Sequence, residues 1–294
     1  MYYNGTGAPP SDEQFVATNL PRLIEIKGTA DAQATGISLI GIGLRDTSYT
    51  YMDPWGVPSG GDWALHRGGA VFAERTQGLT VAACKFSRVD GNALMFSGRN
   101  RDGIVDRNEF VWVGDTAMAA WGYTDEWDGT AGEQPRDITV SRNFCHELGV
   151  YQLQSSCWFQ AKSARITLAH NIFFNGPRSG INFNDGFGGG NLVERNAMWN
   201  QCRQSGDHGP INSWDRQLYL TDVRYGTDKP SFNAAPTVIR HNVIYANYGG
   251  SQGVDNDDGS SWYDIYENFI YGEGLKMDCA RCPDFAETSG HTPS

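Results

Sequence analysis

The sequence predicts an all-β protein, a right-handed parallel β-helix (solenoid) with seven or more coils. Short alternating strands, joined by glycine-bearing turns, recur about every 25 residues, and a period of this length is typical of solenoids. An asparagine follows the opening strand in six of seven segments, as expected for a ladder in which each side chain hydrogen-bonds to the next. These asparagines are Asn108, Asn143, Asn171, Asn196, Asn242 and Asn268, and Cys84 takes their place in the first segment.

The repeats assign most of the chain to a single domain. We expect the β-helix over residues 36–278, an N-terminal segment over residues 1–35 that belongs to a cap or an earlier coil, and a tail over residues 279–294. The chain opens on a segment that resembles a solenoid interior and stops soon after its last acidic coil. Because terminal repeats need caps, we expect their lack to lower the stability and activity of this chain.

The overall charge limits the classes of partner. The formal net charge is -11 and the pI is about 4.9, which argues against nucleic acid because that partner requires a basic face. The sequence contains no run of about 18 apolar residues, so no membrane-spanning helix is predicted. The first residues, "MYYNGTGAPPSDEQ", lack a basic region followed by an apolar stretch, so we find no signal peptide in this chain.

The six cysteines are too dilute for a disulfide scaffold. "CARC", residues 279–282, is a lone CxxC pair without a second pair or a nearby histidine of zinc spacing. We interpret it as part of the tail, and we expect no metal site there.

The later strand of each repeat predicts a polar strip on the outside of the solenoid. Alternation along a strand places every second residue outward, and strands of neighbouring coils lie about 4.8 Å apart. The early coils then show the apolar Leu94, Phe96 and Met118 outside. The later coils show Trp158, Gln160, Asn182, Asn184, Asn212, Trp214, Asp255, Asp257, Lys276 and Asp278.

Three aspartates, Asp185, Asp215 and Asp258, follow directly after these strands and predict a column of carboxylates. Like charges are unfavourable opposite each other in a sheet, so the column favours a substrate cleft, with solvated polar turns as the structural alternative. "SGDHGPINSWDRQ" adds Asp207 and His208 beside the strip.

The acidic run "GVDNDDGSSW" is not an EF-hand loop. Glycine falls at the fifth position from Asp255, and Tyr266 stands at the twelfth, where that loop requires glutamate. The run instead fits one wall of the predicted cleft.

Three motifs carry a resemblance to a known family. "PRSGINFNDGFGGGN", "SGDHGPINSWDRQ" and "GVDNDDGSSWYDIYEN" resemble the β-helix carbohydrate enzymes of glycoside hydrolase family 141, in the pectin-lyase-like superfamily, and the similarity runs from about Leu20 to Asp278. It implies a secreted enzyme that hydrolyses plant or algal cell-wall polysaccharide with aspartates on the helix face. Because the family is associated with fucosidase and xylanase activities, its name does not define the sugar. The motif positions, and hence the catalytic candidates, are Asp185, Asp207, His208, Asp215, Asp257 and Asp258.

Glycoside hydrolysis needs one carboxylic acid to protonate the leaving oxygen and one carboxylate as base or nucleophile. We expect Asp257 or Asp258 to pair with Asp215 or Asp185, with crowding raising one of the two pKa values. The indoles would stack on sugar rings, and amides and charged groups would bind hydroxyls. The predicted substrate-binding residues are Trp158, Asn182, Asn184, Asn212, Trp214, Arg216, Asp255 and Lys276.

Two other functions fit the same fold. The first is a polysaccharide lyase or epimerase, in which aspartates hold calcium against a uronate and a lysine such as Lys276 abstracts the proton. The second is a non-catalytic carbohydrate-binding solenoid, which would tolerate loss of every aspartate. We expect no cofactor, and calcium enters only under the lyase alternative. In every case the partner is a polysaccharide or an oligosaccharide.

Overall fold

The computed structural model consists of strands and turns, and its described residues contain no helix. They accordingly include no helix long and apolar enough to cross a membrane. The described residues are 6–8, 11, 17–58, 63–125, 129, 131–185, 187–214, 235–257, 259–272 and 274–277.

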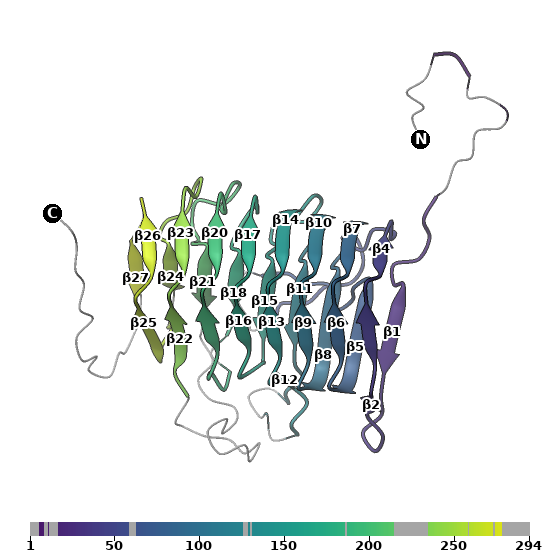
Figure 1. Ribbon diagram of the computed structural model, residues 1–294, viewed down its shortest axis with the longest axis horizontal. Helices are drawn as coiled ribbons and strands as arrows, with labels where there is room; N and C mark the ends of the chain where they lie inside the picture. Colours follow the sequence, from purple (N-terminus) through teal and green to yellow (C-terminus); the bar gives the residue numbers. More distant parts are fainter. Residues whose placement is uncertain are drawn as a thin grey trace.

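The strands form three parallel sheets, which we call A, B and C (Figure 1). Sheet A has eleven strands, of which nine follow one another along the solenoid while β2 pairs at the side of β5 and β12 at the side of β8. Its strands are β1 (Ile24–Lys27), β2 (Ala34–Thr35), β5 (Val71–Gln77), β8 (Leu94–Arg101), β11 (Met118–Trp121), β12 (Pro135–Arg136), β15 (Trp158–Ala161), β18 (Ile181–Phe183), β21 (Ile211–Trp214), β24 (Val254–Asp257) and β27 (Leu275–Met277).

Sheets B and C have eight strands each. Sheet B contains β3 (Ser38–Ile40), β6 (Thr80–Ala82), β9 (Ile104–Asp106), β13 (Thr139–Ser141), β16 (Thr167–Ala169), β19 (Leu192–Glu194), β22 (Thr237–Arg240) and β25 (Tyr263–Tyr266). Sheet C contains β4 (Gly43–Arg45), β7 (Lys85–Val89), β10 (Glu109–Val113), β14 (Phe144–Leu148), β17 (Ile172–Phe174), β20 (Ala197–Trp199), β23 (Val243–Tyr245) and β26 (Phe269–Tyr271).

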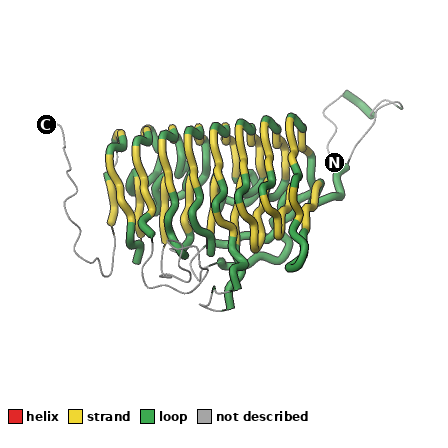
Figure 2. The backbone as a smooth tube through the Cα atoms, turned by 60° about the horizontal axis from the view of Figure 1, so that its bottom comes forward, coloured by secondary structure: helices red, strands yellow, loops and turns green. Residues whose placement is uncertain are grey.

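The chain passes through sheets A, B and C in turn and then begins the next coil, so each strand pairs with its counterpart one coil away. Figure 2 shows these coils stacked side by side along the long axis. Eight strands in each of sheets B and C confirm the predicted parallel β-helix of seven or more coils. The predicted tail over residues 279–294 lies outside the described residues.

The asparagine ladder stands between sheets B and C and has the predicted register. Asn143 Oδ1, for example, accepts from the backbone N–H and the Nδ2 group of Asn108, at 3.0 and 2.9 Å. The same pair of bonds recurs at each step to Asn268, and the backbone N–H of Cys84 donates to Asn108 at 2.9 Å. Every ladder position therefore satisfies a buried backbone donor in the neighbouring coil.

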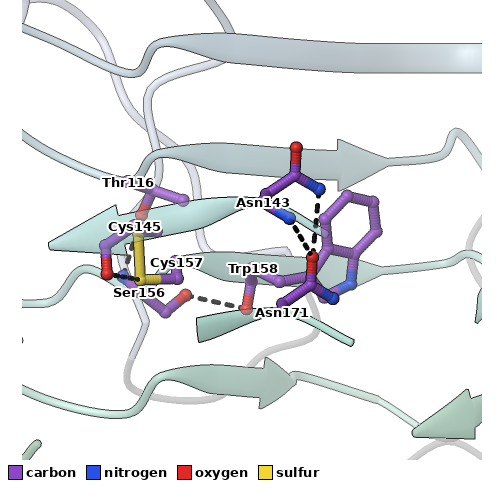
Figure 3. Close-up of a disulfide and its surroundings, with 7 residues drawn as sticks. All are labelled: Thr116, Asn143, Cys145, Ser156, Cys157, Trp158 and Asn171. Atoms are coloured by element: carbon purple, nitrogen blue, oxygen red, sulfur yellow. Dashed lines mark hydrogen bonds between the residues drawn. A yellow bond between two sulfur atoms is a disulfide. The ribbon is translucent and has the colours of Figure 1, made fainter. Parts of the chain in front are cut away.

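Inward-facing apolar side chains from all three sheets fill one continuous core. A disulfide in this core joins Cys145, in β14, to Cys157, just before β15, where the chain passes from sheet C to sheet A (Figure 3). Both cysteines are fully buried, and their Cα atoms are 6.0 Å apart. The sequence did not predict this bridge. Cys84 and Cys202 are buried and are not disulfide-bonded, and Cys279 and Cys282 lie outside the described residues.

The predicted register of sheet A is wrong by one residue in the coils before β18. The structure pairs, in succession, Leu94, Met118, Trp158 and Ile181. The prediction instead placed Ala93, Ala117 and Cys157 level with Ile181, one residue earlier in each of those strands. Since side chains alternate between faces, a slip of one residue exchanges inside and outside.

This slip overturns the outward placement of five side chains. Leu94, Phe96, Met118 and Trp158 belong to the core cluster, and Gln160 pairs with the core residue Phe183. Trp158 is fully buried, and its indole N–H donates to Gln160 Oε1 at 3.0 Å. Trp158 is therefore a core residue and not a sugar-stacking surface. The early coils are apolar on both faces, so their alternation carried no information about which face is inside.

Candidate functional site

The outer face of sheet A changes from apolar to polar along one column of paired residues. Seven successive pairings join this column, which runs parallel to the solenoid axis. Its members are, in order, Phe72, Met95, Ala119, Phe159, Asn182, Asn212, Asp255 and Lys276.

The first half of the column is covered by the segment that precedes β5. Trp63 stacks on Phe159, with ring centroids 5.1 Å apart, and Leu65 joins the same small apolar cluster. Phe72, Met95 and Phe159 are consequently buried. This half is a second core and offers no surface to a ligand.

The second half begins with buried amides. Asn212 Nδ2 donates to Asn182 Oδ1 at 3.0 Å, and Asn182 Nδ2 donates to Asn184 Oδ1 at 3.4 Å. All three side chains are at most 2% exposed. Asn212 Oδ1 has no hydrogen-bond partner among the described residues. An unsatisfied buried acceptor costs about 1–3 kcal/mol, and it could accept a hydroxyl of a bound ligand.

Two carboxylates and one ammonium group close the column. Lys276 Nζ lies 2.7 Å from Asp257 Oδ1 and 3.4 Å from Asp255 Oδ1. Asp255 is fully buried, whereas the side chains of Asp257 and Lys276 are 14% and 30% exposed. The cluster is thus closed at Asp255 and open at Asp257 and Lys276.

The surroundings tune the ionisation of this cluster. Burial raises the pKa of Asp255, although Lys276 and the hydroxyl of Ser251 act in the opposite direction. Burial favours the neutral amine of Lys276, but its contacts with Asp257 and Asp255 outweigh this effect and raise the pKa of Lys276. Lys276 is therefore held as an ammonium ion.

Trp214 pairs with Asp257 across adjacent strands and is partly exposed, as predicted. The indole offers an apolar ring face, and the carboxylate beside it accepts hydrogen bonds. Trp214 thus supplies an accessible aromatic side chain at the open end of the polar column.

Asp185 stands at the turn after β18 and faces the preceding coil. Both of its oxygens lie 2.9 Å from the backbone nitrogen of Lys162, and Oδ1 also accepts from the N–H of Phe187 at 3.3 Å. Burial raises the pKa of Asp185 to about 6, against the opposing effect of these hydrogen bonds. Burial also lowers the pKa of the Lys162 amine, in spite of the nearby Asp185. These two groups form a second titratable pair on the same side of the solenoid.

His208 is buried and held by two side chains. The guanidinium of Arg178 contacts His208 Nε2, and Ser205 Oγ lies 2.9 Å from Nδ1. Because a guanidinium can only donate, Nε2 must accept and Nδ1 carries the hydrogen. Arg178 also lies over the ring of Trp63, 4.8 Å from its centroid. Asp207, by contrast, is exposed.

Ser251 joins His208 to the acidic cluster. Its backbone N–H donates to the carbonyl of His208 at 3.3 Å, and its hydroxyl donates to Asp255 Oδ2 at 3.1 Å. The structure therefore brings together Asp255, Asp257, Lys276 and the neighbouring Trp214, and, among the described residues, only the main chain of His208 is linked to this cluster. Three predicted site residues, Asp215, Arg216 and Asp258, lie outside the described residues.

The sequence interpretation missed Lys162 and Arg178. Lys162 follows its strand at the position that Asp185 takes one coil later, so extending that column back by one coil would have found it. Arg178 reaches the site from a turn, and no periodic signal in the sequence marks it. Within the described part of the chain, no three His, Cys, Asp or Glu side chains are grouped to hold a metal ion.

Comparisons with known proteins identify the fold. No protein-family model matches the sequence, and neither does any curated protein. A solved structure described as "Glycoside hydrolase" superposes with a TM-score of 0.70 at 16% identity, covering 91% of this chain and 51% of that chain. The chain therefore spans about half the length of that protein.

Two further solved structures have lower scores. The mannuronan C-5 epimerase AlgE4 A-module of Azotobacter vinelandii matches with a TM-score of 0.49 at 13% identity, over 86% of this chain and 78% of that chain. An alginate lyase from Paenibacillus sp. str. FPU-7 matches with a TM-score of 0.42 at 13% identity, over 86% and 84%. At 16% identity, the likeness to the first of these structures shows a shared fold, the parallel β-helix.

Proposed function

We propose that the chain is a glycoside hydrolase that acts on a cell-wall or algal polysaccharide and is related to glycoside hydrolase family 141. One observation carries the proposal: Asp255 and Asp257 share Lys276 at the open end of a polar column, beside the partly exposed Trp214. The fold, shared with a structure described as a glycoside hydrolase, supports it.

The two carboxyl groups have environments that suit different roles. Burial raises the pKa of Asp255, which favours the protonated form that a general acid requires. Asp257 is partly exposed and bound to an ammonium group, and as a carboxylate it would act as base or nucleophile. Residues two apart on a strand are separated by about 6.6 Å, and glycosidases use carboxyl separations of about 5–9.5 Å. Asp185 instead faces the preceding coil, two rungs away, so Asp255 is the better partner for Asp257.

The remaining groups of the column are suited to hold the sugar. Asn212 Oδ1 offers an unused acceptor, and Trp214 offers an apolar ring face next to Asp257. Lys276 keeps the two carboxylates in place and balances their charge.

A specific observation favours the second candidate, a lyase or epimerase. Lys162, with its lowered pKa, is the better base, because Lys276 is held protonated between two carboxylates. Calcium does not fit the described acidic cluster, since the Lys276 ammonium group lies against both carboxylates at the place a cation would take.

Product analysis separates these functions. The chain is incubated with xylan-type and fucosylated polysaccharides and with uronate polymers, and both new reducing ends and ultraviolet absorbance are followed. A hydrolase releases reducing ends without absorbance, and Asp255→Asn abolishes the release while Lys162→Met does not. Absorbance from a new double bond, lost in Lys162→Met, would establish the lyase instead. Glycan binding without any product would support the non-catalytic solenoid.

We also propose that the protein works in an oxidising compartment, as a secreted enzyme does. The buried Cys145–Cys157 disulfide supports this, because structural disulfides persist mainly outside the cytosol. Mass spectrometry of alkylated protein from its native compartment would test it, and two free thiols at these positions would contradict it.

A further inference from the structure

Two adjoining cavities lie along the turns that lead from sheet C to sheet A, apart from the acidic cluster, and we call them together the groove. The first has a volume of about 580 Å³ and the second of about 510 Å³, and Trp112 and Val150 line both. Neither is lined by a strand of sheet A. Small-molecule sites in proteins usually have volumes of about 300–1,000 Å³.

A hydrogen-bonded row of polar side chains lines the first cavity. Asn200 Nδ2 donates to Asn175 Oδ1 at 2.6 Å, and Asn175 Nδ2 donates to Glu147 Oε1 at 2.5 Å. These residues occupy equivalent positions at the ends of the sheet C strands in three successive coils, and Trp112 precedes them in the same column. All four have the same left-handed backbone, with φ between 49° and 55°, so the row is built by the repeat itself.

Two aromatic side chains stand at the ends of this row. Trp112 is 55% exposed and Tyr248 is 78% exposed, and neither has a ring contact with another described aromatic side chain. The rings on the face of sheet C differ, because Phe174 and Trp199 stack on each other at 4.7 Å and hide their faces. Trp112 and Tyr248 therefore have ring faces available to a ligand. They are four coils apart, or about 19 Å at 4.8 Å per coil.

Each cation that lines the groove has a carboxylate partner, and Asp90 adds a further carboxylate to the second cavity. Glu147 lies 3.8 Å from Arg203, and Asp46 in the second cavity lies 2.7 Å from Arg88. A groove without a surplus cation does not attract an anionic polymer, and the net charge of -11 repels one. Aromatic faces at the ends with amide and carboxylate groups between them suit a neutral chain of hydroxyl-bearing rings.

We propose that this groove binds a segment of neutral polysaccharide along the solenoid axis, with Trp112 and Tyr248 as stacking platforms and the row from Glu147 to Asn200 as hydrogen-bonding partners. The binding holds the protein on its polymer and requires no turnover. The proposed binding is therefore tested independently of the proposed hydrolase activity.

Affinity electrophoresis in native gels containing soluble xylan, mixed-linkage β-glucan or polygalacturonate tests the proposal. The parent chain should be retarded by at least one neutral polymer and not by polygalacturonate. Trp112→Ala and Tyr248→Ala should each weaken that retention about tenfold, as expected when an aromatic anchor is removed. Tyr266→Ala, which removes an exposed ring on sheet B, is the matched control and should bind like the parent.

Thermal melting of each variant establishes that it is folded. Because Tyr248 is more exposed than Trp112, we expect Tyr248→Ala to disturb the fold less than Trp112→Ala. Three results would overturn the proposal: no retardation of the parent by any neutral polymer, unchanged retention in both groove variants, or an equal loss in Tyr266→Ala. Retention by polygalacturonate alone would also overturn it, because the groove would then select an anionic chain.

Discussion

The two halves of the column on the outer face of sheet A share one strand pairing and spacing, yet they have opposite chemistry. From β5 to β15 the column residues are apolar, and Trp63 and Leu65 cover them. From β18 to β27 they are two amides, one carboxylate and an ammonium group, with the carboxylate of Asp257 beside them. Every step of the column is a parallel pairing in both halves, so strand pairing does not account for the change.

The difference indicates what each half contributes. Burying apolar side chains yields about 25 cal/mol per Å², so the first half stabilises the fold. Burying Asn182, Asn212 and Asp255 gives no such gain and leaves Asn212 Oδ1 without a partner. A polar half that is costly to bury is better explained by ligand binding than by stability.

The largest expected effect comes from removing one carboxylate of the polar half. Asp255→Asn and Asp257→Asn should each lower turnover about 10²–10⁴-fold, because general acid–base catalysis is lost, while the melting temperature changes little. Turnover is measured on whichever polysaccharide the parent cleaves. Ser251→Ala is the control: it removes one hydrogen bond to Asp255, worth about 1 kcal/mol, and leaves both carboxylates in place. Full activity in both asparagine variants would remove the pair from the mechanism.

The apolar half should respond in the opposite way. Phe159→Ala should lower the free energy of unfolding by about 3–5 kcal/mol, since it leaves a cavity under Trp63. Turnover per folded molecule should not change. Urea denaturation measures the first effect, and Phe159→Leu, which nearly conserves volume, should cost less than about 1.5 kcal/mol. A loss of turnover at full stability would show that this half also takes part in catalysis.

The sequence predicted the ladder correctly because its evidence is local. Asn108 and its counterparts recur at the same offset after a short strand, and one residue type serves one turn. The faces of the early strands were not predictable in this way. Around Trp158 both alternating sets are apolar or large, and the choice between them depends on Trp63, which lies far away in the sequence.

The site was predicted only in part, because only the residues marked by strand alternation could be placed from the sequence. Asn182, Asn212 and Asp255 each come directly after an aliphatic residue (Ile181, Ile211 or Val254) that fits the core, so their outward direction followed from alternation. The contacts of Lys276 with two carboxylates, and of Arg178 with His208, depend on side-chain paths and turn shapes. No periodic pattern encodes those.

A third prediction concerns the buried Asp185 at the border between the halves. Its folded-state pKa of about 6 lies above the ordinary 3.8, so between about pH 4 and pH 6 the folded protein holds a proton that the unfolded chain releases. This contribution makes stability fall as pH rises through that window and then level off. Asp185→Asn should lack this fall, and its stability relative to the parent should grow by up to about 3 kcal/mol from pH 4 to pH 7. Urea denaturation across that range measures the difference, and a constant difference would contradict the prediction.

The smallest expected effect on stability comes from Asn212→Leu. This substitution tests the comparison most directly, because it makes one polar position of the column apolar. Asn212→Leu removes a buried amide whose Oδ1 has no partner among the described residues, but it also removes the bond that Nδ2 donates to Asn182. These two effects oppose each other, and each is of the order of 1 kcal/mol. The free energy of unfolding should therefore change by less than about 1.5 kcal/mol.

If Asn212 Oδ1 accepts a hydroxyl of the sugar, binding of oligosaccharide should nevertheless weaken about tenfold. Calorimetry measures this binding in a variant that does not turn the sugar over, such as Asp257→Asn. Asn184→Leu, which removes the amide that accepts from Asn182 directly after β18, should show whether the loss of any nearby amide has the same effect. A large loss of stability in Asn212→Leu, with binding unchanged, would mean that the polar half is a structural network and that the two halves differ only in how they hold the fold together.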